Sequence, residues 1–384
     1  MNLNRASVQK LRSQFHSKLQ EDIPYEKLMK QCLILAQKGA GAVSPNPKVG
    51  AIIFRNGKII GSGFHHKYGG IHAEIDAFQN TLRVADSTLI VNLEPCSHFG
   101  KTPPCADEII KQKISRVIIG TKDPNPVVAG RGIKKMRSAG IDVITGVLED
   151  DCKKFNEFFF KYITKKLPFV AVKAAQTIDG KIADTKNNSQ WISSEQSRKF
   201  VHSLRAEYDA VLIGAGTARA DNPALTVRLT KGRNPHRIVL DGNFSTPVTN
   251  FVFQQQTNER VFFYTSKKCY QKFPKRVAAL TKRGIEIIPM NSDSSNKLNI
   301  HEVILSLAEF GITSLLVEGG ASLFSQFIEQ RLADKVIIFI APKILGQGKG
   351  AFESIRNFSL QSSINLNNIS FLKSGNDIVY EGYL

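Results

Sequence analysis

Long apolar stretches are missing from this sequence. No run approaches the roughly 20 residues of a membrane span, and residues 1–23 lack the apolar core of a secretory signal. Low-complexity segments are also absent. Five cysteines occur in 384 residues, and Cys32, Cys152 and Cys269 are scattered, so no disulfide framework is indicated. We therefore expect a globular, cytoplasmic protein without membrane partners.

Acidic residues are scarce relative to basic ones. The chain has 52 Lys and Arg against 33 Asp and Glu, a formal net charge of +19. Such a charge can serve nucleic-acid binding. The basic residues are nevertheless spread along the chain, with no block of five or six. A generally basic composition is therefore the favoured interpretation, and small anionic substrates are compatible with it.

The order of apolar segments predicts two α/β units. We divide the chain into an N-terminal extension (1–23), a first domain (24–147), a connector with the spacing of one helix (148–167) and a second domain (168–384). In the first domain we expect helices over 25–39 and 74–80, a hairpin turn at Asn56-Gly57 and strands over 49–54, 89–93, 117–120 and 141–144. In the second we expect a helix from Ser193 or Ser194 to about 206, another to about 330, and strands over 169–175, 210–213, 237–240, 261–264, 285–288, 314–318, 335–340 and 378–383.

Four residues of the first domain have the pattern of a zinc site. His72, Cys96 and Cys105 offer one imidazole and two thiols, which suit a tetrahedral Zn²⁺ with one open position. Glu74, two residues after the histidine, is placed to move the protons of a bound water. Zinc nucleobase deaminases show H-x-E…P-C-x-x-C, but here the second thiol comes late, as P-C-x₈-C. The alternative is a closed structural zinc knot, for which His98 is the nearby fourth ligand.

Two strand–glycine–helix junctions occur in the second domain, Gly214-Ala215-Gly216-Thr217 and Gly319-Gly320-Ala321-Ser322. Glycines let phosphates approach backbone N–H groups. Neither junction has the G-x-G-x-x-G spacing, and a simple connector is the alternative. The pair suggests a nucleotide cofactor.

Taken together, the motifs resemble the bifunctional bacterial riboflavin-biosynthesis deaminase/reductases over about residues 25–384. The resemblance is carried by the following segments: Ser44–Gly50, His65, His72–Glu74, the long P-C-x₈-C, Asp123–Pro126, Asp179–Lys181, Trp191-Ile192, Leu204–Ala206, Gly214–Thr217, Asp221–Arg228, Glu318–Gly320 and Ala341–Lys343. The family also carries the wider cysteine gap.

The resemblance implies a cytidine-deaminase-like three-layer domain followed by a dihydrofolate-reductase-like domain. The first would use Zn²⁺ to deaminate 2,5-diamino-6-ribosylamino-4(3H)-pyrimidinone 5′-phosphate. The second would reduce the ribosyl group to ribityl with NADPH. A homo-oligomer without nucleic-acid partners is expected.

Site residues follow from the same resemblance. Substrate contacts would come from Asn46, His65, Lys101, Lys173, Ser189, Arg205, Leu225, Arg228 and Glu318. Cofactor contacts would come from Ala175, Trp191, Thr217, Asp221, Gly242, Gly320, Ala321 and Ser322. The two arginines suit bidentate contact with a phosphate, although Glu318 could instead cap the next helix and Trp191, the only tryptophan, could fill the core. Two departures from the family stand out: Gly70-Ile71 before His72, and Gly242 where a serine is common.

The 2′-phosphate of NADPH needs positive charge. Dihydrofolate-reductase-like chains often hold it after a strand such as 261–264, and here Ser266, Lys267 and Lys268 follow that strand. A solvated turn is the alternative. Two rival functions remain open for the whole chain, namely a tRNA-editing type of nucleic-acid deaminase and a zinc-stabilised scaffold that binds nucleotides without turnover.

Overall fold

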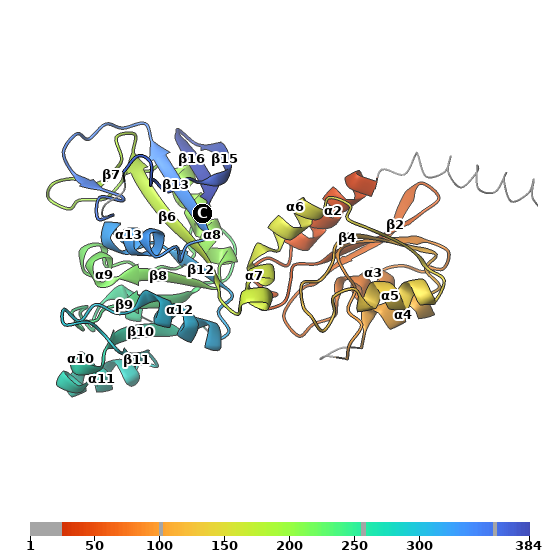
Figure 1. The fold of residues 1–384 in the computed structure, drawn as a ribbon, viewed down its shortest axis with the longest axis horizontal. Coiled ribbons are helices and arrows are strands. Elements are labelled where there is room, and N and C mark those ends of the chain that lie inside the picture. Colours follow the sequence, from red (N-terminus) through yellow and green to blue (C-terminus); the bar gives the residue numbers. More distant parts are fainter. Residues whose placement is uncertain (1–24, 100–102, 255–258, 356–358) are drawn as a thin grey trace, which may run out of the picture. The chain divides into compact units, whose positions relative to one another are not determined.

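The computed structural model describes residues 25–99, 103–254, 259–355 and 359–384 (Figure 1). Two compact units divide between Thr164 and Lys165. The predicted extension 1–23 lies outside the described residues. No helix in the described ranges is long and apolar enough to cross a lipid bilayer.

The first unit is a five-stranded sheet with helices on both faces. Its strands are β1 (Gly50–Arg55), β2 (Lys58–Phe64), β3 (Thr88–Leu93), β4 (Arg116–Thr121) and β5 (Asp142–Thr145), in the order β2-β1-β3-β4-β5. Its helices are α2 (Tyr25–Gln37), α3 (Ala73–Gln79), α4 (Cys105–Lys111), α5 (Arg131–Ser138), α6 (Glu149–Phe155) and α7 (Glu157–Lys165).

Alternation along the strands produces the three layers. Ala51 and Ile53 point into the core under α3, α4 and α5, whereas Ile52 points into the core under α2 and α6. Asn56 and Gly57 have φ angles of 50° and 76°, as the tight turn between β1 and β2 requires. The predicted three-layer domain is confirmed.

The connector is two helices, not the single helix that its apolar spacing predicted. Asn156 separates α6 from α7 and is buried. Its side chain accepts a hydrogen bond from Lys48 N at 2.8 Å and donates one to Lys48 O at 3.0 Å. This double contact fixes the break, and the compact first unit includes the segment up to Thr164.

The second unit is built on a nine-stranded sheet. In chain order its elements are β6 (Phe169–Thr177), β7 (Lys181–Ala183), α8 (Glu195–Glu207), β8 (Ala210–Gly214), α9 (Ala215–Asp221), β9 (His236–Leu240), η1 (Phe251–Phe253), β10 (Val261–Ser266), α10 (Lys267–Lys272), α11 (Pro274–Thr281), β11 (Glu286–Met290), α12 (Ile300–Glu309), β12 (Ser314–Val317), α13 (Ala321–Glu329), β13 (Lys335–Ala341), β14 (Lys349–Gly350), β15 (Asn367–Ser374) and β16 (Asp377–Tyr383). The sheet order is β11-β10-β9-β8-β12-β6-β13-β16-β15, and β7 pairs with β14.

The first seven strands of that order are parallel, and β16 and β15 extend the sheet in antiparallel pairing. Parallel strands end at one edge, where sites in such sheets gather. Ser194 caps α8 by accepting a hydrogen bond from Ser197 N, as predicted. The predicted dihydrofolate-reductase-like domain is confirmed.

Candidate active sites

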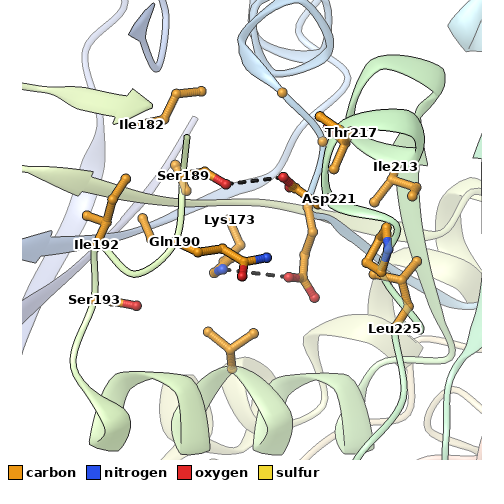
Figure 2. Close-up of a pocket in the computed structure, with 18 of the residues that line it drawn as sticks. Lys173, Ile182, Ser189, Gln190, Ile192, Ser193, Ile213, Thr217, Asp221 and Leu225 are labelled. Carbon is orange, nitrogen blue, oxygen red and sulfur yellow. Dashed lines mark hydrogen bonds and ion pairs between the residues drawn. The ribbon is translucent and has the colours of Figure 1, made fainter. Parts of the chain in front are cut away.

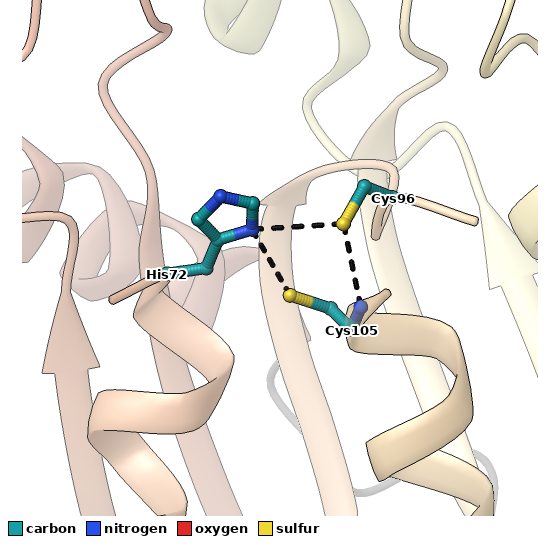
Figure 3. A group of neighbouring side chains, drawn as sticks. All are labelled: His72, Cys96 and Cys105. Atoms are coloured by element: carbon teal, nitrogen blue, oxygen red, sulfur yellow. Dashed lines mark hydrogen bonds between the residues drawn. The ribbon is translucent and has the colours of Figure 1, made fainter. Parts of the chain in front are cut away.

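The predicted zinc ligands come together at the ends of three elements in the first unit. His72 is the N-cap residue of α3, Cys96 follows β3, and Cys105 is the first residue of α4. His72 Nδ1 lies 3.1 Å from Cys105 Sγ and 3.6 Å from Cys96 Sγ, and Cys105 N donates a hydrogen bond to Cys96 Sγ. Figure 3 shows all three side chains pointing to one spot.

The chemistry of this donor set fits Zn²⁺. The three ligand atoms lie within 4.8 Å of one another. A hydrogen bond donated by the Cys105 thiol lowers the pKa of Cys96 to about 4. Donating this hydrogen bond raises the pKa of Cys105, and burial raises it further. A cation would stabilise both thiolates. His98 is exposed and does not belong to the group, so the described ligands leave one coordination position open, as in catalytic zinc sites.

Glu74 lies in the first turn of α3 and is only 3% exposed. Burial raises the pKa of its carboxyl group, which His72 partly opposes. It lines a cavity of about 340 Å³ together with His72 and Cys96. A buried carboxyl beside the three ligands, and outside their group, is suited to proton transfer.

Asn46 and His65 line the same cavity. Asn46 Nδ2 lies 3.2 Å from His65 Nε2, and His65 Nδ1 lies 2.8 Å from Ile71 O. His65 therefore contacts the backbone of Ile71, the residue before His72. Because the contact is made to the backbone, it does not depend on the unusual side chain at position 71. Burial lowers the pKa of His65. Lys101 lies outside the described residues.

Sequence reasoning missed several residues of this cavity. Asp123 and Asn125, which were recognised only as part of a motif, line it, as do Phe159 and Tyr162 of α7. Burial raises the pKa of Asp123 to about 6. Asp123 could have been expected here from the sequence, because it follows a predicted strand, and neighbouring parallel strands end at the same edge of a sheet. The structure pairs β3 and β4 in parallel, so both end at this edge.

Glu94 organises the backbone beside these residues, and it was not predicted either. Its buried carboxylate accepts hydrogen bonds from the backbone N–H groups of Asp123, Gly130, Gly132 and Ile133. It thus ties the end of β3 to the segment that carries Asp123.

The second unit contains a larger cavity, of about 1240 Å³, at the ends of its parallel strands. At its base Arg205 donates two hydrogen bonds to Glu318, at 2.6 and 2.9 Å, and Lys173 Nζ lies 3.6 Å from the same carboxylate. Burial opposes ionisation of Glu318, but Arg205 and Lys173 outweigh it and lower its pKa to about 2. Burial lowers the pKa of Lys173.

This arrangement changes the interpretation of Arg205. Two groups of its guanidinium already bind Glu318, and Nη1 donates to Thr226 O at 3.3 Å. The bidentate face predicted to hold a phosphate therefore holds a carboxylate in this structure. Glu318 caps no helix, since α13 begins after Gly320 without a side-chain cap.

The remaining predicted substrate residues line the same cavity. These are Ser189, Leu225 and Arg228. Ser189 donates to Asp221 Oδ1 at 3.1 Å, as Figure 2 shows. Arg228 is exposed, and its Nη1 donates to Thr226 Oγ1 at 3.0 Å, which leaves further donors for a ligand.

Predicted cofactor residues divide between this cavity and a second one of about 490 Å³. The larger cavity is lined by Ala175, Trp191, Thr217, Asp221 and Gly320, and the smaller by Thr217, Gly242, Gly320, Ala321 and Ser322. Trp191 is 63% exposed with Arg198 over its ring, so it does not fill the core. A Cβ added at Gly216 would meet nothing within 4 Å, and one at Gly320 would lie 3.4 Å from Thr217 Oγ1. This open space fits a dinucleotide phosphate.

Ser266 does not line either cavity. Its side chain is fully buried, donates to Gly242 O at 2.7 Å and accepts from Cys269 N as the cap of α10. The predicted contact of this hydroxyl with the cofactor does not agree with that geometry, because both of its partners belong to the protein.

Comparisons with known proteins identify both units. Residues 23–121 match the cytidine and deoxycytidylate deaminase zinc-binding region, and residues 168–380 match the RibD C-terminal domain. The riboflavin biosynthesis protein RibD of Aquifex aeolicus is 42% identical, covering 83% of this chain and 87% of the relative; that of Actinobacillus pleuropneumoniae is 37% identical, covering 90% and 89%.

A solved structure supports the same comparison across both units. The diaminohydroxyphosphoribosylaminopyrimidine deaminase/5-amino-6-(5-phosphoribosylamino)uracil reductase of Thermotoga maritima superimposes with a TM-score of 0.81 at 43% identity, covering 94% of this chain and 98% of that one.

Proposed function

Because this chain belongs to the RibD family of bifunctional deaminase/reductases in riboflavin biosynthesis, we propose how its two sites divide the work. The first unit hydrolyses an amino group from 2,5-diamino-6-ribosylamino-4(3H)-pyrimidinone 5′-phosphate. The second reduces the ribosyl group of that product to ribityl. The observation that supports this assignment is that each unit has a candidate site lined by its own residues: a zinc donor set beside a buried Glu74 in the first, and a cavity of about 1240 Å³ lined by Lys173, Arg205 and Glu318 in the second.

In the deaminase, His72, Cys96 and Cys105 would hold Zn²⁺, which would supply the Lewis acidity that makes water a nucleophile at neutral pH. Glu74 takes a proton as the water attacks the ring carbon and delivers it to the departing amine, so that ammonia leaves. Its burial excludes bulk water from this transfer. Asn46, His65 and Asp123 surround the remaining space and orient the pyrimidine.

In the reductase, the residues that would hold NADPH are Ala175, Trp191, Thr217, Asp221 and the Gly320 junction, and the cofactor would supply the hydride. Reduction at the sugar C1′ breaks its bond to the ring oxygen, which then needs a proton. Lys173 is the proposed donor, because its ammonium faces the cavity and its pKa is lowered by burial. Glu318 and Arg205 position Lys173, and Arg228 offers free donors to the phosphate.

Separate assays of the two half-reactions test this assignment. The full chain should release ammonia from the diaminopyrimidinone phosphate without NADPH, and should oxidise NADPH when given the deaminated product directly. Ammonia release that required NADPH, or no NADPH oxidation with the deaminated product, would contradict it.

Three further expectations belong to this proposal. The protein acts in the cytoplasm as a homo-oligomer, and it takes small phosphorylated pyrimidines instead of nucleic acid. The scattered distribution of basic residues supports the last point.

A further inference from the structure

The residues first expected to bind the 2′-phosphate of NADPH do not line either cofactor cavity. Ser266 is buried as a helix cap. Lys267 and Lys268 line a separate hollow of about 320 Å³ together with the 290–294 segment and Asn296. The groups that can bind a dianion must therefore come from the lining of the cofactor cavities themselves, and the smaller cavity, of about 490 Å³, contains such groups.

A turn over residues 293–297 closes one side of this smaller cavity. Asp293 Oδ1 accepts hydrogen bonds from Ser295 N, Ser295 Oγ and Lys297 N, at 2.7–2.9 Å. Asn296 Nδ2 donates to Asn243 Oδ1 at 2.8 Å. Ser295, Asn296 and Lys297 all line the cavity, so the turn brings an ammonium group to it.

The unusual Gly242 is explained by this turn. A Cβ at Gly242 would lie 1.7 Å from the backbone oxygen of Asn296. A serine at this position would therefore push the turn away, and the hydrogen bond that a serine would offer to the cofactor must be supplied by other residues.

Three cationic side chains line the smaller cavity, those of Arg219, Lys297 and Lys349, and of these Arg219 is held in place by a hydrogen bond to the cavity wall. It lies on the exposed side of α9, lines both the larger and the smaller cavity, and donates a hydrogen bond to Ser245 Oγ. Ser245 in turn donates to Asp241 Oδ1 at 3.0 Å. This chain of contacts orients the guanidinium from a buried anchor while leaving most of its five N–H donors for a ligand.

Asp241 is the acidic residue among the described residues that line the smaller cavity. An acid at this strand end would bind the free 2′-hydroxyl of NAD. Asp241 is only 2% exposed, and its Oδ2 accepts from Thr246 N at 2.5 Å and from Thr246 Oγ1 at 2.7 Å. Its carboxylate is hydrogen-bonded within the protein, so the charged side chains of this lining that remain for a ligand are the cations Arg219, Lys297 and Lys349.

We propose that the 2′-phosphate of the cofactor binds in the smaller cavity between Arg219 and the turn that carries Lys297. Arg219 is then the residue that makes the reductase prefer NADPH to NADH. This assignment rests on the proposed reductase function. Guanidinium groups bind phosphate through paired hydrogen bonds, and Thr217 and Gly320, which line both cavities, provide the path from the hydride site to this phosphate.

The subsite can be tested without catalysis by measuring, with calorimetry, the affinity of the full chain for 2′,5′-ADP and for 5′-AMP. These two nucleotides differ only in the 2′-phosphate. Wild-type protein should bind 2′,5′-ADP more tightly. Arg219→Gln keeps a group that can contact Ser245 but removes the charge. It should weaken 2′,5′-ADP binding about 10- to 100-fold, the range for a charge-assisted hydrogen bond, and leave 5′-AMP binding unchanged.

A Lys267→Ala/Lys268→Ala double variant is the matched control and should retain the wild-type discrimination. Loss of discrimination in this variant and not in Arg219→Gln would move the phosphate to the neighbouring hollow. Equal affinity of wild-type protein for both nucleotides would also contradict the subsite. By contrast, wild-type protein that bound 2′,5′-ADP selectively but failed to oxidise NADPH with the deaminated product would contradict only the proposed reaction.

Discussion

Both units act on a phosphorylated pyrimidine, but their sites differ in how far apart the contributing residues are in the sequence and in how large the cavities are. The deaminase site gathers its ligands within 34 residues around a cavity of about 340 Å³. The reductase site draws on residues from Lys173 to Lys349 around cavities of about 1240 and 490 Å³. A metal concentrates chemistry at one point, whereas a dinucleotide and a sugar phosphate need an extended surface.

Two buried carboxyl groups show the difference most clearly. Burial raises the pKa of Glu74, which has one imidazole as its main favourable neighbour. The pKa of Glu318 falls to about 2, because Arg205 and Lys173 overcome the same desolvation. The first carboxyl group is kept able to exchange protons, and the second is kept charged. Neighbouring charge, and not burial alone, therefore separates a proton carrier from a structural anion.

The largest effect is expected from Glu74→Gln. The variant loses the proton-transfer group but keeps the shape of the site, so deamination should fall by about 10²- to 10⁴-fold. Zinc content, measured by atomic absorption, should remain stoichiometric, because Glu74 is not among the ligands. NADPH oxidation with the deaminated product should be unchanged.

Exposed Glu26 of α2 provides the matched control, and Glu26→Gln should leave both activities intact. A Glu74→Gln protein that lost its zinc along with its activity would show that Glu74 is a ligand.

Glu318→Gln should damage the other unit. The substitution leaves Arg205 and Lys173, whose side chains are only 13% and 14% exposed, without their counter-charge, and breaking a buried ion pair costs about 3–5 kcal/mol. We expect the reductase unit to unfold at a lower temperature in scanning calorimetry and to lose NADPH oxidation, while deamination persists. Glu309→Gln, on an exposed position, is the control. A Glu318→Gln protein of wild-type stability would refute the charge balance described for this cavity.

A smaller, pH-dependent effect is expected from His202 in the reductase unit. Burial, with Arg205 and Arg228, lowers its pKa to about 4, and its Nδ1 accepts a hydrogen bond from Arg228 N at 2.9 Å. The unfolded value is near 6.5. The folded state thus prefers neutral histidine, so this contribution to stability is complete above about pH 6.5 and is lost as the pH falls through 4.

His202→Asn can still accept the hydrogen bond but cannot be protonated. Between pH 6.5 and 4 its midpoint of urea unfolding should fall less steeply than that of the wild type, and exposed His301→Asn should follow the wild type. Parallel curves for wild type and His202→Asn would show that His202 does not carry this pH dependence.

The sequence predicted the strands well where both faces are buried. Ala210–Ile213 is a continuous apolar run, Phe169–Ala175 is apolar except for Lys173, and both form central strands. By contrast, β15 was not predicted, because seven of its eight residues are exposed and it carries no buried alternation. The short helix α9 was expected only as the helix of a strand–glycine–helix junction, without bounds, since Gly214 to Asp221 has almost no apolar face.

The grouping of His72, Cys96 and Cys105 could be expected from the sequence, because their residue types and spacing both point to one metal site; their roles stay a prediction. The ion group at Arg205 could not be expected, because a guanidinium's partner depends on how β12 and α8 are brought together in space. Ser266 illustrates the same limit: hydroxyl and lysines suggest an anion site, yet the hydroxyl begins a helix. Position in the fold, and not residue type, decided both cases.

The most direct test of two consecutive reactions is to supply the diaminopyrimidinone phosphate and NADPH together and follow ammonia and NADPH in the same sample. Ammonia should appear first, and NADPH oxidation should follow after a lag and reach the same amount, one per substrate. With Glu74→Gln both signals should fall together, and adding the deaminated product should restore NADPH oxidation alone. NADPH oxidation that began without ammonia release would contradict the account.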